Sequence, residues 1–309
     1  METLSLPVSV SLLHSNLVAS DTTLAFVSNI KPNPQIHLLS LDSLKTPNLH
    51  NSLVKYKSEE EVLHINYLKV NNKWYLILGF YQSLQIWNED GTRMLGYISK
   101  DEITGGDLET YFIGSCCCEL INSIVVGSSK GSISILNISD ERLCNFSTSL
   151  TLYGKNREPI SVLCSYKSFV LSVSENGTGT FWNMEQKIEL NSLDGPGVSA
   201  TVGTNLKKFA IVGFGNGEVK VYNMKDKNIL CNIWAHTRWI TGICKHATRP
   251  IFITCAEDGF VNIWAIRNGE IETVSSKEYP HFLLTGVALS KDTAMIVTYD
   301  RSKLILEPL

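Results

Sequence analysis

A short strand-turn-strand pattern recurs along this chain, and each copy closes on a large apolar residue. The clearest copies are FVLSVSENGTGTFW, FAIVGFGNGEVKVY and IFITCAEDGFVNIW, which end at Trp182, Tyr222 and Trp264. Weaker copies end at Trp87, Leu136 and Leu306, and a decayed copy ends near Leu39. Successive anchors are 48, 49, 46, 40, 42 and 42 residues apart. Steps of about 40 to 45 residues are expected when each unit folds as one four-stranded blade.

The units contain short apolar runs rich in Val, Ile, Phe and Tyr, separated by Gly, Asn, Asp or Ser, which are typical of β-strands. No helical periodicity extends over eleven residues. We therefore predict an all-β fold, a single seven-bladed β-propeller over residues 1–309, with blades closing near residues 39, 87, 136, 182, 222, 264 and 306. Glycines fill the same hairpin turn in four units, where positive φ is needed: Gly131, Gly177, Gly217 and Gly259.

The sixth unit carries four polar or aromatic residues in a distinctive order. Ala235-His236 precedes its first strand, Thr254 and Asp258 bracket the end of its second strand, and Trp264 closes it. This pattern resembles the WD-repeat family, in which Gly-His, Ser/Thr, Asp and Trp occupy the matching positions. The resemblance implies that His236, Thr254, Asp258 and Trp264 form a hydrogen-bonded tetrad that stabilises the blade. A structural role fits, because a buried indole N–H, imidazole and carboxylate each need a partner.

The other units depart from that pattern. Unit four keeps Ser172 and Trp182 but has Asn176 at the Asp position and Asn156 at the His position. Unit five has Val212, Asn216 and Tyr222, and unit three has Val126, Lys130 and Leu136. We therefore expect most blades to be held by apolar packing alone.

The seventh unit needs an outer strand, because only three residues follow Leu306 on its third strand. In WD-repeat propellers the N-terminal segment supplies this strand. The run TLSLPVSV, residues 3–10, alternates apolar and small polar residues as a strand does. Pro7 cannot donate to a ladder, which suits an outermost edge. We expect residues 3–10 to complete blade seven.

Composition limits the partners and the compartment. The chain is 44% hydrophobic and 18% charged, with a formal net charge of -3 and no basic block, so no nucleic-acid partner is expected. The N-terminus lacks a secretory signal and no stretch has eighteen apolar residues, so we expect no membrane insertion and no secretion. A cytoplasmic protein is expected, the resemblance suggests vesicle-associated signalling, and a ciliary setting goes with the alternative of a subunit in a larger assembly. The eight cysteines look like small buried hydrophobes, and Cys116, Cys117 and Cys118 would fill an inner strand, with their modification left open.

The sequence shows no set of residues suited to catalysis, a cofactor or a metal. GFGNG at 213–217 is followed by a strand-like run where a dinucleotide site needs a helix, so we expect no cofactor. Cys231, His236, Cys244 and His246 are close in sequence, but no Cys-x2-Cys pair exists and no metal site is expected. No nucleophile elbow is present, so we expect a protein that is not an enzyme.

We therefore predict a protein-protein interaction scaffold or adaptor. The resemblance implies a partner face built from the turns between second and third strands and from the loops that enter each inner strand. The candidate residues are Tyr81, Glu175, Glu257 and Tyr299 in the turns, and Thr237, Arg238 and Trp239 in a loop. Trp239 beside Arg238 has the composition of an interface anchor, although packing against the next blade is an equal alternative. Two other functions stay open: a structural subunit of a larger assembly, such as a ciliary or trafficking complex, and a small-molecule receptor or enzyme in the central channel.

Overall fold

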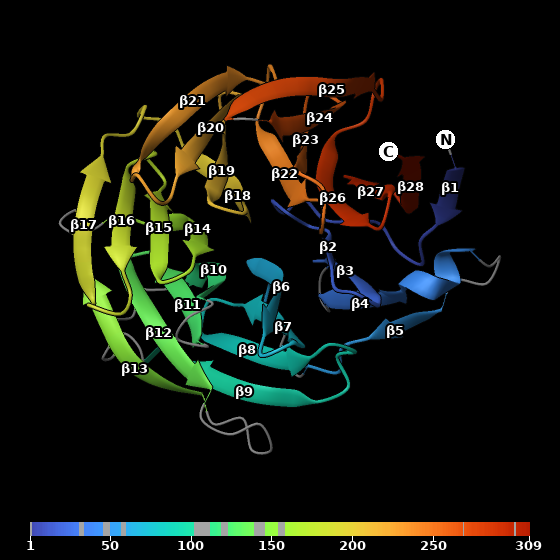
Figure 1. Ribbon diagram of the computed structural model, residues 1–309. Helices are drawn as coiled ribbons and strands as arrows, with labels where there is room; N and C mark the ends of the chain where they lie inside the picture. The colour runs from blue at the N-terminus through green and yellow to red at the C-terminus, as the bar shows by residue number, and fades with distance from the viewer. Residues whose placement is uncertain are drawn as a thin grey trace.

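The strands form sheets arranged radially around a centre, which is the architecture of a β-propeller (Figure 1). The computed structural model describes residues 2–30, 34–45, 50–56, 60–101, 112–118, 123–138, 146–153, 158–267, 269–299 and 301–309. Within these residues, the strands make seven antiparallel sheets of four strands each. The fold is all-β, and a short 3-10 helix, η1 (Leu41–Lys45), follows strand β4.

Six blades are each built from four consecutive strands, which run in order from the innermost strand outward. Blade one contains β2 (Val18–Ala19), β3 (Thr23–Ser28), β4 (Gln35–Ser40) and β5 (Asn51–Leu53). Blade two contains β6 (His64–Val70), β7 (Lys73–Gly79), β8 (Ser83–Asn88) and β9 (Met94–Ser99). Blade three contains β10 (Phe112–Cys118), β11 (Ser123–Ser128), β12 (Ser132–Ile138) and β13 (Phe146–Tyr153).

Blades four to six repeat this order. Blade four contains β14 (Ile160–Tyr166), β15 (Phe169–Ser174), β16 (Gly179–Asn183) and β17 (Ile188–Leu193). Blade five contains β18 (Ala200–Leu206), β19 (Phe209–Phe214), β20 (Glu218–Asn223) and β21 (Asn228–Trp234). Blade six contains β22 (Ile240–Lys245), β23 (Ile251–Ala256), β24 (Phe260–Arg267) and β25 (Glu270–Glu278).

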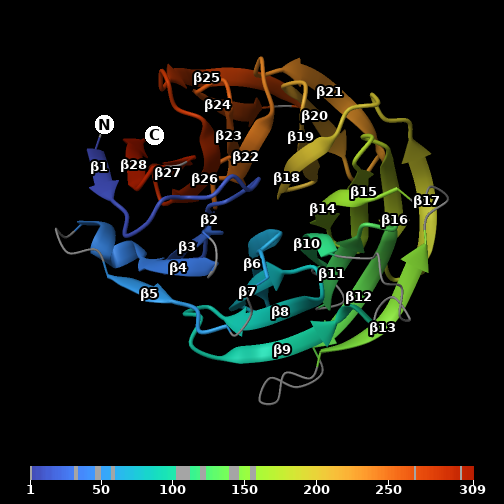
Figure 2. The same cartoon turned by 180° about the vertical axis from the view of Figure 1, so that it is seen from behind.

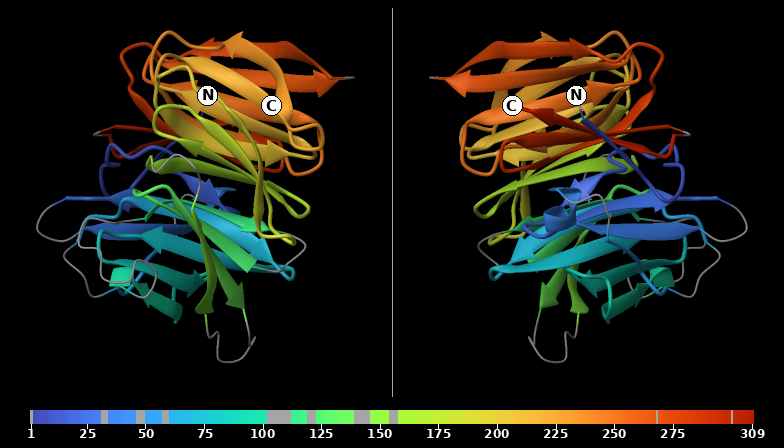
Figure 3. Two further views of the ribbon diagram at one scale, coloured as in Figure 1. Left: turned by 90° about the vertical axis from the view of Figure 1, so that its left-hand side faces the viewer. Right: turned by 90° about the vertical axis from the view of Figure 1, so that its right-hand side faces the viewer.

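The seventh sheet joins the two ends of the chain. From the centre it contains β26 (Leu284–Ser290), β27 (Thr293–Thr298), β28 (Lys303–Pro308) and β1 (Glu2–Ser5). Strand β1 pairs antiparallel with β28, and both termini lie side by side in the edge-on views (Figure 3). The expected strand over residues 3–10 is shorter than predicted and ends at Ser5, because Pro7 has no N–H for a ladder. Farther along, Val10 makes only an isolated parallel bridge with Tyr299.

The seven predicted anchors share one position in the fold. All lie on the third strand of their sheet and are at most 7% exposed: Leu39, Trp87, Leu136, Trp182, Tyr222, Trp264 and Leu306. The glycines predicted to need positive φ have it, at 75° in Gly131, 86° in Gly177, 85° in Gly217 and 80° in Gly259. A large apolar side chain at the same place in each sheet fills the space between radial sheets, which explains the period.

The core consists of apolar clusters between neighbouring blades. One cluster joins Phe26 and Leu39 of blade one to Met295 and Leu304 of blade seven, with Leu6 of the N-terminal segment beside them. The remaining clusters join each of the other neighbouring pairs of blades. Each sheet thus buries both faces, and the chain is stabilised by contacts between blades more than by a single central core.

Hydroxyl groups on the inner strands add polar links between blades. Thr201 and Thr241 each occupy a β-bulge at the start of an inner strand. Thr201 Oγ1 donates to the carbonyl of Ile240 at 2.6 Å, from blade five to blade six. Thr241 Oγ1 donates to the carbonyl of Leu284 at 2.7 Å, from blade six to blade seven. A β-bulge changes the direction in which one side chain points. Here the threonine at each bulge points to the next blade and bonds its backbone.

The N-terminal segment supplies the corresponding link on the other side of blade seven. It runs from β1 towards the inner end of β22, as the view from behind shows (Figure 2). There the backbone N–H of Ser15 donates to the Thr241 carbonyl at 2.7 Å, and that of Asn16 donates to the Thr285 carbonyl at 3.2 Å. The fully buried Asn16 side chain also bonds the backbone N–H and carbonyl of Val27 in β3. The segment therefore connects blades six, seven and one.

Candidate functional site

The structure brings the four predicted tetrad residues of blade six together. His236 precedes β22, Thr254 lies on β23, Asp258 lies in the following turn and Trp264 lies on β24. Trp264 Nε1 is 3.0 Å from Thr254 Oγ1, which is 2.8 Å from His236 Nε2. His236 Nδ1 is 3.2 Å from both carboxylate oxygens of Asp258. The four side chains form one chain of hydrogen bonds across the blade.

Donor and acceptor capacities fix the direction of this chain. The Trp264 indole can only donate, so Thr254 Oγ1 accepts from it and donates its own proton to His236 Nε2. His236 then carries its proton on Nδ1 and donates it to Asp258. Burial alone would raise the pKa of Asp258, but hydrogen bonds from His236 and from the backbone N–H groups of Thr237 and Phe260 lower it overall. The arrangement satisfies buried groups and leaves no reactive atom exposed.

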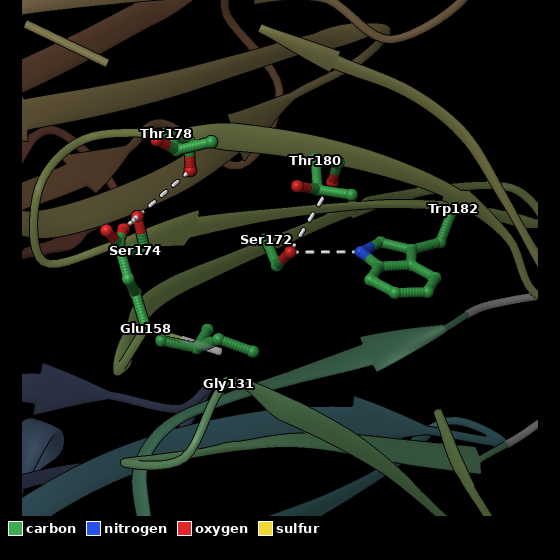
Figure 4. Close-up of a pocket in the computed structure, with 8 residues that line it drawn as sticks. Gly131, Glu158, Ser172, Ser174, Thr178, Thr180 and Trp182 are labelled. Carbon is green, nitrogen blue, oxygen red and sulfur yellow. Dashed lines mark hydrogen bonds between the residues drawn. The ribbon is translucent and has the colours of Figure 1, made fainter. Parts of the chain in front are cut away.

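Blade four retains half of this arrangement and adds a residue that the sequence pattern did not indicate. Trp182 Nε1 donates to Ser172 Oγ at 2.9 Å, as in blade six. Beyond Ser172 lies a cavity of about 20 Å³, which Glu158 and Ser174 also line (Figure 4). Ser174 donates to Glu158 at 3.1 Å, and Asn176 Nδ2 donates to the same carboxylate. The predicted counterpart of His236, Asn156, lies outside the described residues.

Blade two also gives its anchor a polar partner, beside the apolar packing that was expected to hold most blades. In blade two, Trp87 Nε1 donates to Gln85 Oε1 on the same strand, at 3.2 Å. Blade five does follow the expectation: Val212 and Tyr222 occupy the positions of Thr254 and Trp264, and both are buried. Tryptophan at the anchor therefore comes with a polar partner in blades two, four and six.

The predicted partner residues lie on one face of the ring, which we call the entry face. It carries the turns between second and third strands and the loops that lead into the inner strands. Backbone hydrogen bonds join these two sets: the N–H of Glu257 donates to the Trp239 carbonyl at 3.0 Å, and that of Tyr299 to the Leu283 carbonyl at 2.8 Å. Glu175 makes the same contact with Pro159 in blade four.

The entry face exposes several large apolar side chains. Trp239 is 42% exposed, Tyr299 46% and Tyr81 49%. Leu12 and Ile30 are also more than half exposed. Beside them Thr237, Arg238 and Glu175 are exposed, and Glu257 is half-buried.

Trp239 combines both roles that the sequence left open. Its ring lies against Gly215 of blade five, where an added Cβ would meet ring atoms at 3.0 Å. The ring also stacks on His14 of the N-terminal segment, with centroids 5.7 Å apart. Burial lowers the pKa of His14. Trp239 is therefore packed on one side and open to solvent on the other, as expected of a pre-positioned anchor.

Of the four histidines and cysteines that are close in sequence around His236, the two histidines have other partners, and Cys231 and Cys244 are half-buried free thiols. His236 is bonded within the tetrad, and His246 contacts Arg249 and Asp292. Over the described part of the chain, no three side chains of metal-ligating type come together. Cys164 and Cys255 are buried free thiols, and burial raises the pKa of each to about 12. Cys116, Cys117 and Cys118 lie on β10 as predicted, but their side chains are outside the described set. None of the described helical residues forms a span long and apolar enough to cross a membrane.

The radial four-stranded sheets and the His-Thr-Asp-Trp tetrad are those of a WD-repeat β-propeller. No protein-family model matches the chain. Among curated proteins it is similar to WD repeat-containing protein 54 of Mus musculus, at 22% identity over 204 residues, covering 63% of this chain and 60% of the relative. WD repeat domain 54 of Rattus norvegicus matches at 22% identity with the same coverage. The match thus spans about three-fifths of the length of these relatives.

Other relatives share the fold at lower coverage or identity. The U3 small nucleolar RNA-associated protein 21 homologue of Schizosaccharomyces pombe is 23% identical over 165 residues, covering 52% of this chain and 18% of that protein. Solved structures of U3-55K and of the RRP9 WD40 repeats each align with 100% of this chain, at a TM-score of 0.77 and 14% identity. The alignments cover 98% of the U3-55K chain and 97% of the RRP9 chain. A chain of the mitotic checkpoint complex aligns over the same length with a TM-score of 0.77, at 12% identity and 91% coverage of that chain. These similarities establish the propeller fold.

Proposed function

We propose that this protein is a non-catalytic scaffold that binds a protein segment on the entry face, with Trp239 as the central anchor. The observation that carries the proposal is the group of exposed apolar side chains there, with Trp239 held in place by Gly215 and His14. Aromatic residues and arginine are the side chains enriched at interface centres. Arg238 lies beside Trp239 and is exposed. WD-repeat propellers are typically interaction scaffolds, which supports the same function.

The scaffold is proposed to be one closed domain over residues 1–309 with seven blades, the last completed by the N-terminal strand. The seven four-stranded sheets and the pairing of β1 with β28 support this organisation. The apolar cluster between blades seven and one supports it as well. A closed ring is rigid, so its loops can present binding residues at low entropic cost.

The test compares partner affinity between variants. Proximity labelling in cells identifies candidate partners, and their affinity is then measured for the wild type, Trp239→Ala and Arg238→Ala. If Trp239 or Arg238 is an anchor, its replacement by alanine should weaken binding by about 2 kcal/mol, or roughly 30-fold. The matched control is Tyr97→Ala, because Tyr97 is 52% exposed within the outer strand β9, away from the turns and loops of the entry face. Partners that bind Trp239→Ala and the wild type equally well would refute the entry-face site.

A second candidate function is a subunit fixed within a larger assembly. Apolar side chains are exposed on several outer strands, including Tyr97 on β9, Trp234 on β21 and Val274 on β25. One curated relative is a U3 small nucleolar RNA-associated protein, and one structural neighbour belongs to the mitotic checkpoint complex. These names favour an RNA-associated or multiprotein assembly. The cytoplasmic, vesicle and ciliary settings stay predictions from the sequence. Loss of partners with Tyr97→Ala, but not with Trp239→Ala, would select this function.

A further inference from the structure

Four lysines occur at a fixed spacing on the face opposite the entry face. Lys167, Lys187, Lys207 and Lys227 are each 20 residues apart, which is half of one blade repeat in this region. They lie in the turns that join first to second strands and third to fourth strands of blades four and five. Each has a left-handed backbone, with φ of 53°, 59°, 55° and 58°. Lysine thus recurs at a left-handed position in all four of these hairpins: Lys167 and Lys207 are the first residues of two-residue turns, and Lys187 and Lys227 are the last residues of four-residue turns.

Lysine is an unusual choice for this backbone conformation. The left-handed region favours glycine, and among other residues it favours asparagine and aspartate, because a Cβ crowds the following carbonyl. A turn selected only for its shape would contain glycine, as Gly177 and Gly217 do on the entry face of the same blades. At each of these positions lysine costs stability relative to glycine, and it brings a positive charge that glycine lacks. Repeated use of lysine therefore indicates that the charge has a function.

Contacts between the turns place these lysines on one continuous surface. The N–H of Met224 donates to the Lys208 carbonyl at 2.9 Å, which joins the two turns of blade five. Asn191 of blade four donates to the Lys227 carbonyl at 3.3 Å. The Lys227 ammonium of blade five also lies 4.9 Å from the centroid of the Phe169 ring of blade four. The two blades therefore share one surface, and we call it the lysine patch.

The lysine patch is strongly positive although the whole chain is acidic. Its members are Lys167, Lys187, Lys207, Lys208, Lys225 and Lys227. The same turns carry two acidic residues, Glu185 and Asp226, so six positive and two negative charges leave a local net charge of +4. The chain as a whole has a net charge of -3. A local field of this kind attracts polyanions.

The composition of the patch distinguishes between polyanions. The four turns contain no arginine, so the patch offers lysine ammonium groups, which bind phosphate as point charges, and no planar fork for bidentate contacts. Ile188, which follows Lys187, is the one exposed large hydrophobic side chain next to these turns in the described residues, and a single isoleucine is little apolar surface to insert into a bilayer. Half-buried aromatic rings lie under the ammonium groups, with Lys208 over Phe209 and Lys227 over Phe169. Positive charge interleaved with aromatic rings is typical of single-stranded nucleic-acid binding.

We propose that the lysine patch binds the phosphate backbone of single-stranded RNA without reading its sequence. The site is separate from the entry face, so the propeller could hold a protein segment on one face and RNA on the other. Binding through the backbone depends on charge and is weakened by salt.

The test measures fluorescence anisotropy of a labelled mixed-sequence RNA about 20 nucleotides long, titrated with the full chain at several salt concentrations. With about four phosphates contacted, log K should fall against log salt with a slope of about -3. The triple variant Lys187→Gly, Lys207→Gly, Lys227→Gly should lose at least about 10-fold in affinity and most of the salt slope. Because glycine suits the left-handed backbone, this variant should melt no lower than the wild type. A lysine-to-arginine triple variant should bind RNA as the wild type does.

A matched single substitution separates the patch from general charge. Lys291→Gly in blade seven removes one charge at the same backbone geometry, φ 51°, but beside the Arg249–Asp292 ion pair. We expect Lys207→Gly to weaken RNA binding at least about twofold and Lys291→Gly to leave it unchanged. Equal RNA binding by the triple variant and the wild type would overturn the proposal. So would binding to phosphatidylserine vesicles or poly-glutamate without binding to RNA.

Discussion

Replacing Thr254 by valine tests whether the blade-six tetrad stabilises the propeller. The two side chains have the same shape, so the change removes a hydroxyl without opening a cavity. Thr254 is fully buried, and its hydroxyl serves both the Trp264 N–H and His236 Nε2. Each buried polar group that loses its partner costs about 1 to 3 kcal/mol. The Trp264 N–H loses its acceptor and His236 Nε2 keeps only a long contact with Asn262 Nδ2, at 3.4 Å, so we expect a loss of about 3 kcal/mol in the free energy of unfolding. Valine itself is compatible with the position, because Val212 occupies it in blade five.

The assay is urea unfolding followed by tryptophan fluorescence and by circular dichroism. Ser172→Ala in blade four is the matched control, since Ser172 serves one indole, that of Trp182, and a cavity beside it can admit a water. We expect Ser172→Ala to cost about half as much as Thr254→Val. Trp264→Phe combined with Thr254→Val should cost less than the sum of the two single changes, because no indole N–H is left without a partner. A loss below about 1 kcal/mol for Thr254→Val, or strict additivity with Trp264→Phe, would refute this reasoning.

Three further predictions concern the ring and the pH dependence of its stability. Deleting residues 1–10 removes β1 and the buried Leu6, and should lower the melting temperature markedly; an unchanged melting temperature by calorimetry would exclude closure by this segment. Thr241→Val removes the hydroxyl that links blades six and seven, and should cost about 1 kcal/mol in urea unfolding, whereas no loss would show that the link is dispensable. Asp258 has a folded pKa below its ordinary 3.8, so its stabilisation is present above that pH and is lost as pH falls through the folded pKa. The stability gap between the wild type and Asp258→Asn should therefore narrow from pH 6 to pH 3, and an equal gap at both pH values would contradict this assignment.

The blade repeat could be predicted because each anchor performs the same packing task. Leu39 lies in the most decayed copy, yet its spacing from Trp87 placed it on the third strand of blade one. The path of the N-terminal segment could not be predicted in the same way. Its hydrogen bonds join Ser15 to Thr241 and Asn16 to Thr285, through backbone groups that are the same in every residue. Such contacts depend on the assembled ring and leave no local signal.

The tetrad could be predicted because its four side chains have complementary donors and acceptors. Blade four shows where that reasoning ends. Spacing placed Asn156 opposite Ser172, whereas the described network uses Glu158, which accepts from Ser174 and Asn176. In blade four both the His position and the Asp position of the tetrad pattern are changed. Comparison with the blade-six pattern shows that each residue differs, but it does not show which side chains replace the network. A half-buried carboxylate beside a polar cavity is recognisable once the loop and the hairpin are seen together.

The lysine patch shows why the linear charge pattern gives no indication of nucleic-acid binding. Lysines that are 20 residues apart do not form a basic block along the chain. In an antiparallel propeller, however, every second turn returns to the same face, so a spacing of half a blade repeat brings distant lysines to one surface. The informative signal is the spacing combined with the turn position, because Lys207 and Lys227 stand where glycine is preferred. In repeat proteins, charge should therefore be counted over turns that share a face and not along the sequence, and here that count finds a basic patch opposite the exposed apolar side chains of the entry face.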